Sequence, residues 1–361
     1  MTQKRETYII AEAGVNHNGC LQTAMKMVAA AADAGANAIK FQAFKSDKLV
    51  TRYAPKAAYQ QENTRENSGQ YEMLQKLELR SSDFLQLKNY CVEKGIEFLA
   101  TPFDEDSLNF LVDSCGLKII KISSGDLTNA PFLLQAAKTG LPIILSTGMA
   151  TVGEIEKALA VLAYGYSLGI GAEKFTWDDA YNAYISEDGQ QLLHQRVTLL
   201  HCTTEYPAPM EEVNLLAMQA MKSTFGLPVG YSDHTEGLAV SIGAVALGAC
   251  MLEKHFTLDK QMAGPDHKAS LEPAELKQLT QEMRNMESAL GNGIKAPGLH
   301  ERKNRLAARK SLVAGRKICE GEIFTKENLT IKRPGNGVSP ERYWDYLGTR
   351  ALKDYTEDEL V

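Results

Sequence analysis

The chain has 361 residues, of which 44% are hydrophobic and 23% charged, and a formal net charge of −6. This length and composition predict a globular protein with one large domain and one small one. The negative charge argues against nucleic acid or an anionic membrane as a partner, and no apolar run is long enough to span a bilayer. The first residues lack the pattern of a signal peptide, and the six cysteines form no CxxC pair. We therefore expect reduced thiols and a cytoplasmic protein.

Eight short apolar runs recur along the chain, and a helical pattern follows most of them. They span residues 8–14, 38–44, 97–103, 119–126, 142–148, 197–203, 228–234 and 251–257. Eight strands that alternate with helices over roughly 270 residues predict an α/β fold of the (β/α)8 barrel type, which we place at residues 1–290. An open doubly wound sheet is the alternative, but no GxGxxG motif opens the first helix.

The helices carry their own start and stop signals. Thr151 and Glu154 have the spacing of a capping box, and Ser82 is a candidate N-cap for a helix that stops at Gly95. Pro273 suits the first turn of the last barrel helix.

Several segments depart from the strand–helix rhythm. Residues 45–72 form a long polar segment after the second strand, which on a barrel is a common place for an active-site loop. Residues 164–195 precede the sixth strand and are expected to be a surface insertion. Residues 291–305 contain helix-breaking GNGIKAPG and are expected to be a linker. Residues 306–361 have short alternating strands and no long helix, which indicates a small β-rich domain.

Two histidines at predicted strand ends are the first candidates for chemistry. Alternate residues of a strand share a face, so Ser232 pairs with His234 and Glu253 with His255. The helix expected over 236–249 makes the unit strand–helix–strand, whose parallel strands end on the same side. Both imidazoles are then placed to share one divalent metal, for which nitrogen ligands favour Mn, Fe, Co or Zn over Mg. The alternative is that each is a hydrogen-bonded structural histidine.

The other strand ends are polar at the i, i+2 spacing that points side chains into a barrel. They offer Glu12, Lys40, Gln42, Thr101, Lys121, Ser123, Ser146, His201, Thr203 and, in the turns that follow, Asp126 and Tyr206. Lys40 and Lys121 lie inside apolar strands, where an unpaired ammonium is costly. An anionic ligand such as a phosphate or a carboxylate explains them better than solvation does. Glu12 has a second interpretation, as the salt-bridge partner of one of these lysines.

At these residues the sequence resembles the sialic acid synthase family, that is, the N-acetylneuraminate synthases and their legionaminate and pseudaminate relatives. The shared strings include AEAGVNHNG, KFQ, TPFDEDS, KISSGD, LSTGMAT, HCTTEYPAP, GYSDHT, EKHFTLDK, GPDHKASLEP and KRPGNG. The resemblance implies a barrel joined to a C-terminal antifreeze-like (SAF) domain in a domain-swapped homodimer. It also implies condensation of phosphoenolpyruvate with an N-acetylated aminohexose in its open-chain aldehyde form, with release of phosphate.

The resemblance also implies a role for each matching residue. His234 and His255 match the pair that binds Mn2+, with Mg2+ or Co2+ as alternatives. Positions around phosphoenolpyruvate are matched by Lys40, Gln42, Thr101, Lys121, Ser123, Ser146 and Ser232. Glu12 matches the carboxylate that handles the attacking water, with Glu253 beside it. Sugar contacts are matched by Tyr206, Asp266 and Arg333, the last reaching the partner's barrel. Asp126 stands where the family commonly has glutamate, and the 164–195 insertion is larger than usual.

From these observations we predict an N-acetylneuraminate synthase that uses open-chain N-acetylmannosamine with the help of a metal. The close alternative is an N,N'-diacetyllegionaminate synthase that uses 2,4-diacetamido-2,4,6-trideoxymannose. A carbohydrate- or ice-binding protein acting through the C-terminal domain is the non-enzyme alternative, although it needs no lysines or paired histidines inside the barrel. A metal-dependent hydrolase on the same barrel would need an acidic metal ligand but no phosphate cradle.

Overall fold

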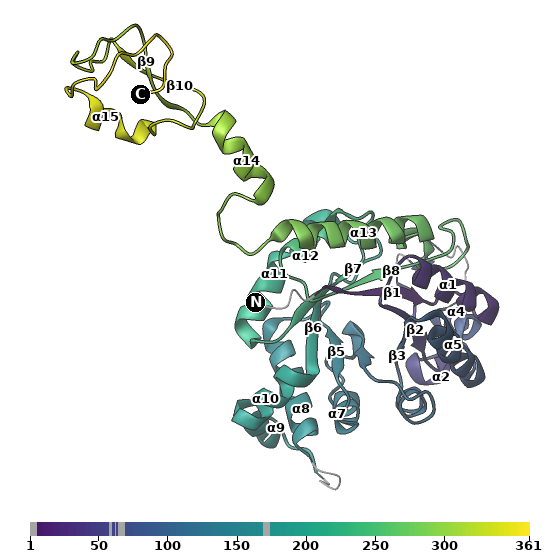
Figure 1. The fold of residues 1–361 in the computed structure, drawn as a ribbon. Helices are drawn as coiled ribbons and strands as arrows, with labels where there is room; N and C mark the ends of the chain where they lie inside the picture. The colour runs from purple at the N-terminus through teal and green to yellow at the C-terminus, as the bar shows by residue number, and fades with distance from the viewer. Residues whose placement is uncertain (1–5, 58–59, 62, 64–68, 169–173) are drawn as a thin grey trace. The chain divides into compact units, whose positions relative to one another are not determined.

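The computed structural model describes residues 6–57, 60–61, 63, 69–168 and 174–361 (Figure 1). The chain divides into two compact units, Met1–Leu290 and Gly291–Val361. Each unit has its own hydrophobic core.

The first unit is built on eight parallel strands. In space they follow the order β3-β2-β1-β8-β7-β6-β5-β4, and β3 and β4, at the two ends of this order, are in contact. The sheet therefore curls into a nearly closed barrel, as Figure 1 shows. The predicted (β/α)8 barrel is confirmed, and the open doubly wound sheet is wrong. The strands are β1 (Tyr8–Gly14), β2 (Ala38–Ala43), β3 (Glu97–Pro102), β4 (Ile120–Ile122), β5 (Ile143–Ser146), β6 (Val197–His201), β7 (Val229–Asp233) and β8 (Met251–His255).

Helices surround the strands, and capping hydrogen bonds and left-handed glycines mark where some of them begin and end. Thr151 Oγ1 accepts a hydrogen bond from Glu154 N, and Thr151 N donates one to the Glu154 carboxylate, so the predicted capping box is confirmed. Gly95 ends its helix in the left-handed region, at φ 69°. The helices include α1 (Leu21–Asp33), α2 (Ser46–Leu49), α4 (Gln70–Leu77), α5 (Ser81–Lys94), α6 (Glu105–Asn109), α7 (Ala130–Lys138), α8 (Val152–Ser167), α9 (Trp177–Ile185), α10 (Glu187–Arg196), α11 (Leu216–Phe225), α12 (Ala239–Ala246) and α13 (Pro273–Leu290).

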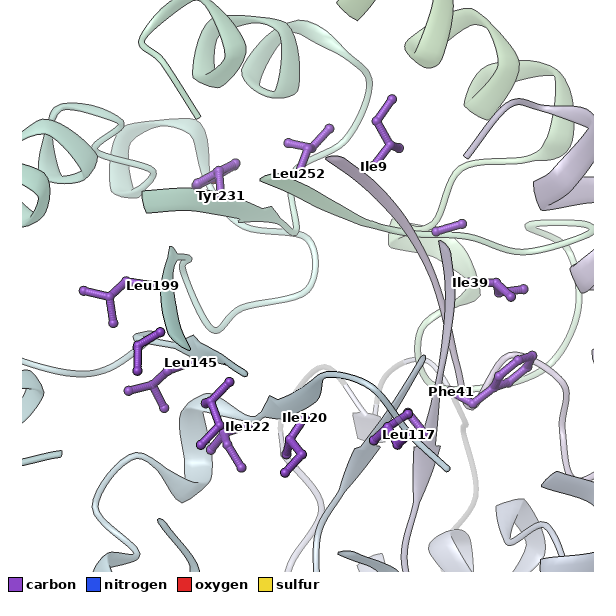
Figure 2. Close-up of a cluster of buried hydrophobic side chains, with 14 of the residues drawn as sticks. Ile9, Ile39, Phe41, Leu117, Ile120, Ile122, Leu145, Leu199, Tyr231 and Leu252 are labelled. Carbon is purple, nitrogen blue, oxygen red and sulfur yellow. The ribbon is translucent and has the colours of Figure 1, made fainter. Parts of the chain in front are cut away.

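Strand alternation divides the buried apolar side chains between two sides of the sheet. Figure 2 shows Ile9, Ile39, Leu199 and Leu252 pointing away from the ring of strands, into the layer packed against the helices. The residues between them point inward. A separate cluster inside the barrel contains Ile10, Ala38, Leu99, Ile144 and Leu200. This inner apolar layer closes the barrel below the carboxyl ends of the strands, as is usual for the fold.

The two segments expected to interrupt the barrel contain helices. Residues 164–195 contain the end of α8, all of α9 and nearly all of α10, which pack on one another and bury Ala180 and Leu193. The segment is thus part of the helical layer, with residues 169–173 outside the described residues. The segment 45–72 contains α2 and the start of α4, and its residues 58–59, 62 and 64–68 are likewise outside the description.

The second unit is small and rich in β-structure, as predicted. Its antiparallel strands β9 (Ser311–Ala314) and β10 (Leu329–Lys332) lie over a core that contains Leu312, Phe324 and Tyr355. Helix α14 (Leu299–Ala308) occupies the second half of the expected linker, and α15 (Tyr343–Tyr346) is a single turn. In the described parts of the chain, no helix is both long and apolar enough to cross a membrane.

Candidate active site

A cavity of about 220 Å³ opens at the carboxyl ends of the barrel strands. Most of the predicted site residues line it, and they come from the eight strands or from the segments that follow them. They are Glu12, Lys40, Gln42, Thr101, Lys121, Ser123, Ser146, Tyr206, Ser232, His234, Glu253 and His255. Their common position follows from the period of two, because each inward apolar residue of the lower layer is followed two residues later by a polar one. Ile10 precedes Glu12 in this way, and Ile144 precedes Ser146.

Two lysines and two glutamates form one buried charge cluster at the floor of the cavity. Lys40 Nζ lies 2.5 Å from Glu12 Oε2 and 3.6 Å from Glu253 Oε2. Lys121 Nζ lies 3.5 Å from Glu253 Oε1. Lys40 Nζ also donates to Thr101 Oγ1 at 2.9 Å. Glu12 therefore does form a salt bridge with one of the lysines, as its second interpretation predicted. Both lysines are paired with carboxylates of the protein itself even when no ligand is bound.

The carboxylates and ammoniums of this cluster differ in their pKa values. Burial acts to raise the pKa of Glu253, but Lys121, Lys40 and the Ser232 hydroxyl outweigh it and hold the pKa at about 2. Burial raises the pKa of Glu12 in spite of the neighbouring Lys40. Burial also lowers the pKa of Lys121, which Glu253 opposes and Lys40 reinforces. Of the two ammoniums, Lys121 is therefore the one whose buried charge is less fully offset by nearby carboxylates. An added anion would stabilise the charge of Lys121 more than that of Lys40.

The two histidines at the ends of β7 and β8 face each other across the cavity, with ring centroids 5.5 Å apart. His234 Nδ1 donates to the carbonyl oxygen of Thr203 at 2.6 Å, which leaves the lone pair on Nε2. His255 Nδ1 is buried and makes no hydrogen bond. Burial lowers the pKa of His234 to about 4 and that of His255 well below its ordinary value. Burial thus favours the neutral form of both rings, which is the form that can act as a metal ligand.

This donor set fits a divalent metal only with help from outside the protein. Among the residues that the structure describes, no group of three or more His, Cys, Asp or Glu side chains is arranged to hold a metal ion. The imidazole pair offers two nitrogens, one of them an orphaned buried atom, and the carbonyl of Thr203 orients the His234 ring. The pair therefore fits a metal that takes its remaining ligands from water or substrate.

Three predicted site residues lie outside the cavity lining. Asp126 ends a short 3-10 turn, where its Oδ1 accepts a hydrogen bond from Asn129 at 3.1 Å. Asp266 is buried in the loop after β8, and burial, followed by the charge of Glu12, raises its pKa to about 7. Arg333 belongs to the second unit, where it follows β10 with an exposed side chain.

The sixth strand corrects the sequence-based register. We expected His201 and Thr203 to point inward, but Leu200 belongs to the inner layer, and Cys202 and Thr204 line the cavity. The His201 Nε2 instead bonds to the carbonyl oxygen of Val213 at 2.8 Å. Other lining residues that the sequence did not single out are Phe103, Gly125 and Met149.

Comparisons with known proteins extend over nearly the whole chain. The model of the NeuB family matches residues 27–295, and that of the SAF domain matches residues 309–361. The N,N'-diacetyllegionaminic acid synthase of Campylobacter jejuni is 51% identical over 357 residues, which are 99% of each chain. The enzyme of that name from Legionella pneumophila is 44% identical over 95% of this chain and 90% of its own. Among solved structures, the N-acetylneuraminic acid (sialic acid) synthetase of Leptospira borgpetersenii, in complex with citrate, has 36% identity and a TM-score of 0.67. That match covers 83% of this chain and 90% of the other.

Proposed function

This chain belongs to the NeuB family, and from that premise we propose that it is an N,N'-diacetyllegionaminate synthase. The observation that carries the choice is the 51% identity to the Campylobacter jejuni enzyme over 99% of both chains, against 36% for the Leptospira sialic acid synthetase. The N-acetylneuraminate synthase that we predicted first is right at the level of the family. The legionaminate alternative has the better support.

The proposed reaction joins phosphoenolpyruvate to open-chain 2,4-diacetamido-2,4,6-trideoxymannose and consumes one water. A bond forms between C3 of phosphoenolpyruvate and the aldehyde carbon C1, and the aldehyde oxygen takes up a proton. The water oxygen bonds to C2 of the former phosphoenolpyruvate and loses a proton. The bond from C2 to the bridging phosphate oxygen then breaks. The C2 hydroxyl loses its proton and becomes the carbonyl of a 2-keto acid, and the departing phosphate takes up a proton and leaves as inorganic phosphate.

The lysines serve the anionic substrate in this proposal. Phosphoenolpyruvate carries a phosphate and a carboxylate, for which Lys40 and Lys121 supply charge-assisted hydrogen bonds. Lys121 donates to Ser146 Oγ at 2.7 Å, so its head group is already oriented before a ligand enters. Because Lys121 is the less compensated ammonium, we place the phosphate nearer to Lys121 than to Lys40.

The two carboxylates have separate roles that follow from their surroundings. Glu253 stays ionised and holds the lysines, as its low pKa indicates. Glu12, whose pKa burial raises, is the better proton acceptor for the water that adds to C2. Gln42 Nε2 lies 3.4 Å from Glu12 Oε1 and restrains the free side of that carboxylate.

His234 and His255 are the residues that would hold a divalent metal, Mn2+ in our proposal with Mg2+ or Co2+ as alternatives. When bound, such an ion supplies Lewis acidity for the sugar aldehyde. The protein orients the pair itself: Thr203 fixes the His234 tautomer, and the Tyr206 ring lies 4.2 Å from that of His234. The ring of His255 is within 5.4 Å of the same tyrosine.

The domain-swapped homodimer, with Arg333 serving the partner's barrel, stays a proposal that rests on the resemblance. Mixing Arg333→Ala with Glu12→Ala subunits, after dissociation and reassociation, should restore activity, because a heterodimer has one site with both residues intact. An inactive mixture in which heterodimers are demonstrated would place the arginine in its own subunit's site.

Phosphate release tests the proposed reaction. The purified protein is incubated with Mn2+, phosphoenolpyruvate and either 2,4-diacetamido-2,4,6-trideoxymannose or N-acetylmannosamine. We expect phosphate release that depends on the sugar and is faster with the diacetamido sugar. Faster release with N-acetylmannosamine would overturn the substrate assignment. No release with either sugar would favour a protein that binds carbohydrate without converting it.

A further inference from the structure

A second cavity, of about 480 Å³, adjoins the catalytic cavity. The two share Met149, Cys202 and Thr204 in their linings. The second cavity lies between the start of α8, which contributes Ile155, and α11, which contributes Ala220 among other apolar residues. It therefore extends the site sideways, out of the barrel mouth and between two helices.

The lining of this second cavity also contains polar groups, among them the side chains of Glu205 and Glu212, and some are satisfied by the protein itself. Thr147 Oγ1 donates to the carbonyl oxygen of Leu200 at 2.9 Å, and Thr203 Oγ1 donates to that of Glu212 at 3.1 Å. Thr204 Oγ1 differs, since it is buried and makes no hydrogen bond within the described chain. A buried hydroxyl without a hydrogen-bond partner destabilises the protein, and such groups commonly bind an ordered water or a ligand.

The backbone at Gly148 lies close to this hydroxyl. A Cβ added to Gly148 would lie 2.2 Å from Thr204 Oγ1, so only glycine permits this approach. The next residue, Met149, adopts a left-handed φ of 64°, which is unusual for a residue with a side chain. Its side chain is 70% exposed and lines both cavities. Met149, Cys202 and Thr204 thus form the wall that the two cavities share, and the thioether of Met149 is its flexible part.

We propose that the second cavity binds the acetamido group on C4 of the sugar, an inference that rests on the proposed function. An acetamido group has a methyl end, which suits Ile155 and Ala220, and an amide end, which can pair with the Thr204 hydroxyl. The acetamido group on C2 is adjacent to the reacting carbon and stays in the catalytic cavity. Thr204 directly follows Thr203, whose carbonyl orients His234, so the opening lies beside the histidine pair.

This assignment explains why a sugar with two acetamido groups would be preferred. N-acetylmannosamine carries a hydroxyl on C4, which leaves the apolar part of the second cavity unfilled and buries less apolar surface. A site that hydrogen-bonds a substrate group discriminates strongly against an analogue that lacks the group, because the protein partner is left unpaired.

The test compares two sugars that differ only at C4: 2,4-diacetamido-2,4,6-trideoxymannose and 2-acetamido-2,6-dideoxymannose. The measured quantity is the ratio of their kcat/KM values. Thr204→Val removes the hydroxyl and keeps the shape, and Ala220→Leu fills the cavity from α11. Each should lower the ratio at least about tenfold, as expected for one lost buried hydrogen bond or a blocked methyl site. Gln219→Leu, on the same helix but outside the cavity lining, is the matched control and should leave the ratio unchanged.

Binding of the two unreactive alditols, measured by calorimetry, gives the same comparison without turnover. If the wild type prefers the diacetamido sugar but both variants keep the wild-type ratio, the second cavity is not the C4 subsite and the proposed function stands. If the wild type prefers the monoacetamido sugar, the proposed function is wrong and this inference falls with it.

Discussion

Replacing Lys121 by methionine tests the electrostatic part of the proposed site most sharply. The cluster of Lys40, Lys121, Glu12 and Glu253 is neutral as it stands, so the substitution leaves a net negative charge facing an anionic substrate. A direct pair at about 4 Å with an effective dielectric constant near 20 is worth about 4 kcal/mol. Glu253 can respond by taking up a proton, because the substitution removes one of the groups that lower its pKa. We therefore expect a net loss of about 2–3 kcal/mol, roughly 30- to 150-fold in the Kd of phosphoenolpyruvate.

Calorimetric titration of phosphoenolpyruvate without sugar measures this loss directly. Sugar binding should change much less. Lys118→Met, at an exposed position just before β4, is the matched control and should bind phosphoenolpyruvate like the wild type. A Lys121→Met protein that stays folded and keeps its Kd within twofold would refute the phosphate assignment, as would an equal loss for both substrates.

Three further predictions concern the metal, the base and the fold. His234→Ala and His255→Ala should each abolish turnover with little change in unfolding temperature, and a chelated wild type should be equally inactive until Mn2+ is restored; full activity after chelation would remove the metal from the mechanism. Glu12→Gln should lower kcat about 100-fold or more, as measured in the steady state, and a smaller effect would assign the base elsewhere. Burial lowers the pKa of both His17 and His267 to about 4. Below pH 6.5 the two imidazoles therefore bind protons in the unfolded protein but stay neutral in the folded one. The free energy of unfolding should consequently fall by up to about 3 kcal/mol for each histidine as the pH approaches 4. Urea unfolding between pH 4 and 7 measures this slope, which His267→Gln should reduce. An unchanged slope in that variant would contradict the low pKa of His267.

The barrel was predictable because its signal is repeated along the chain. Each strand is short, apolar and followed by polar residues, and the period of two then assigns inward residues wherever an apolar and a polar residue alternate. Glu12, Ser146 and Ser232 were placed correctly for this reason. The sixth strand lacks that contrast, since Leu199 and Leu200 are both buried and apolar. The inward assignment of His201 and Thr203 was therefore wrong by one residue.

Strand ends and caps were less predictable, because they depend on local competition between polar groups. The fourth strand was expected to run to residue 126 but ends at Ile122, because the Ser123 side chain accepts a hydrogen bond from Gly125 and starts a 3-10 turn. That turn takes Asp126 away from the cavity lining. At α5 the expected cap Ser82 is wrong, since Asp83 closes a box with Arg80 instead.

Ion pairs between residues of different strands could not be predicted from the sequence, for a different reason. Lys254 is fully buried on the outward side of β8, where its Nζ lies 3.0 Å from Asp233 Oδ2 and donates to the carbonyl oxygen of Thr235 at 2.6 Å. Nothing in the local pattern names such a partner, because the pairing depends on the register between β7 and β8. The same holds for Glu253, whose two lysine partners come from distant strands.

A competition between the two candidate sugars tests the central claim most directly. The protein receives phosphoenolpyruvate, Mn2+ and equal concentrations of 2,4-diacetamido-2,4,6-trideoxymannose and N-acetylmannosamine, and mass spectrometry gives the initial ratio of the two products. Substrates that compete for one site are consumed in the ratio of their kcat/KM values. We expect the diacetamido product to exceed N-acetylneuraminate at least about tenfold, the discrimination that one satisfied buried polar group provides. An excess of N-acetylneuraminate would contradict the assignment.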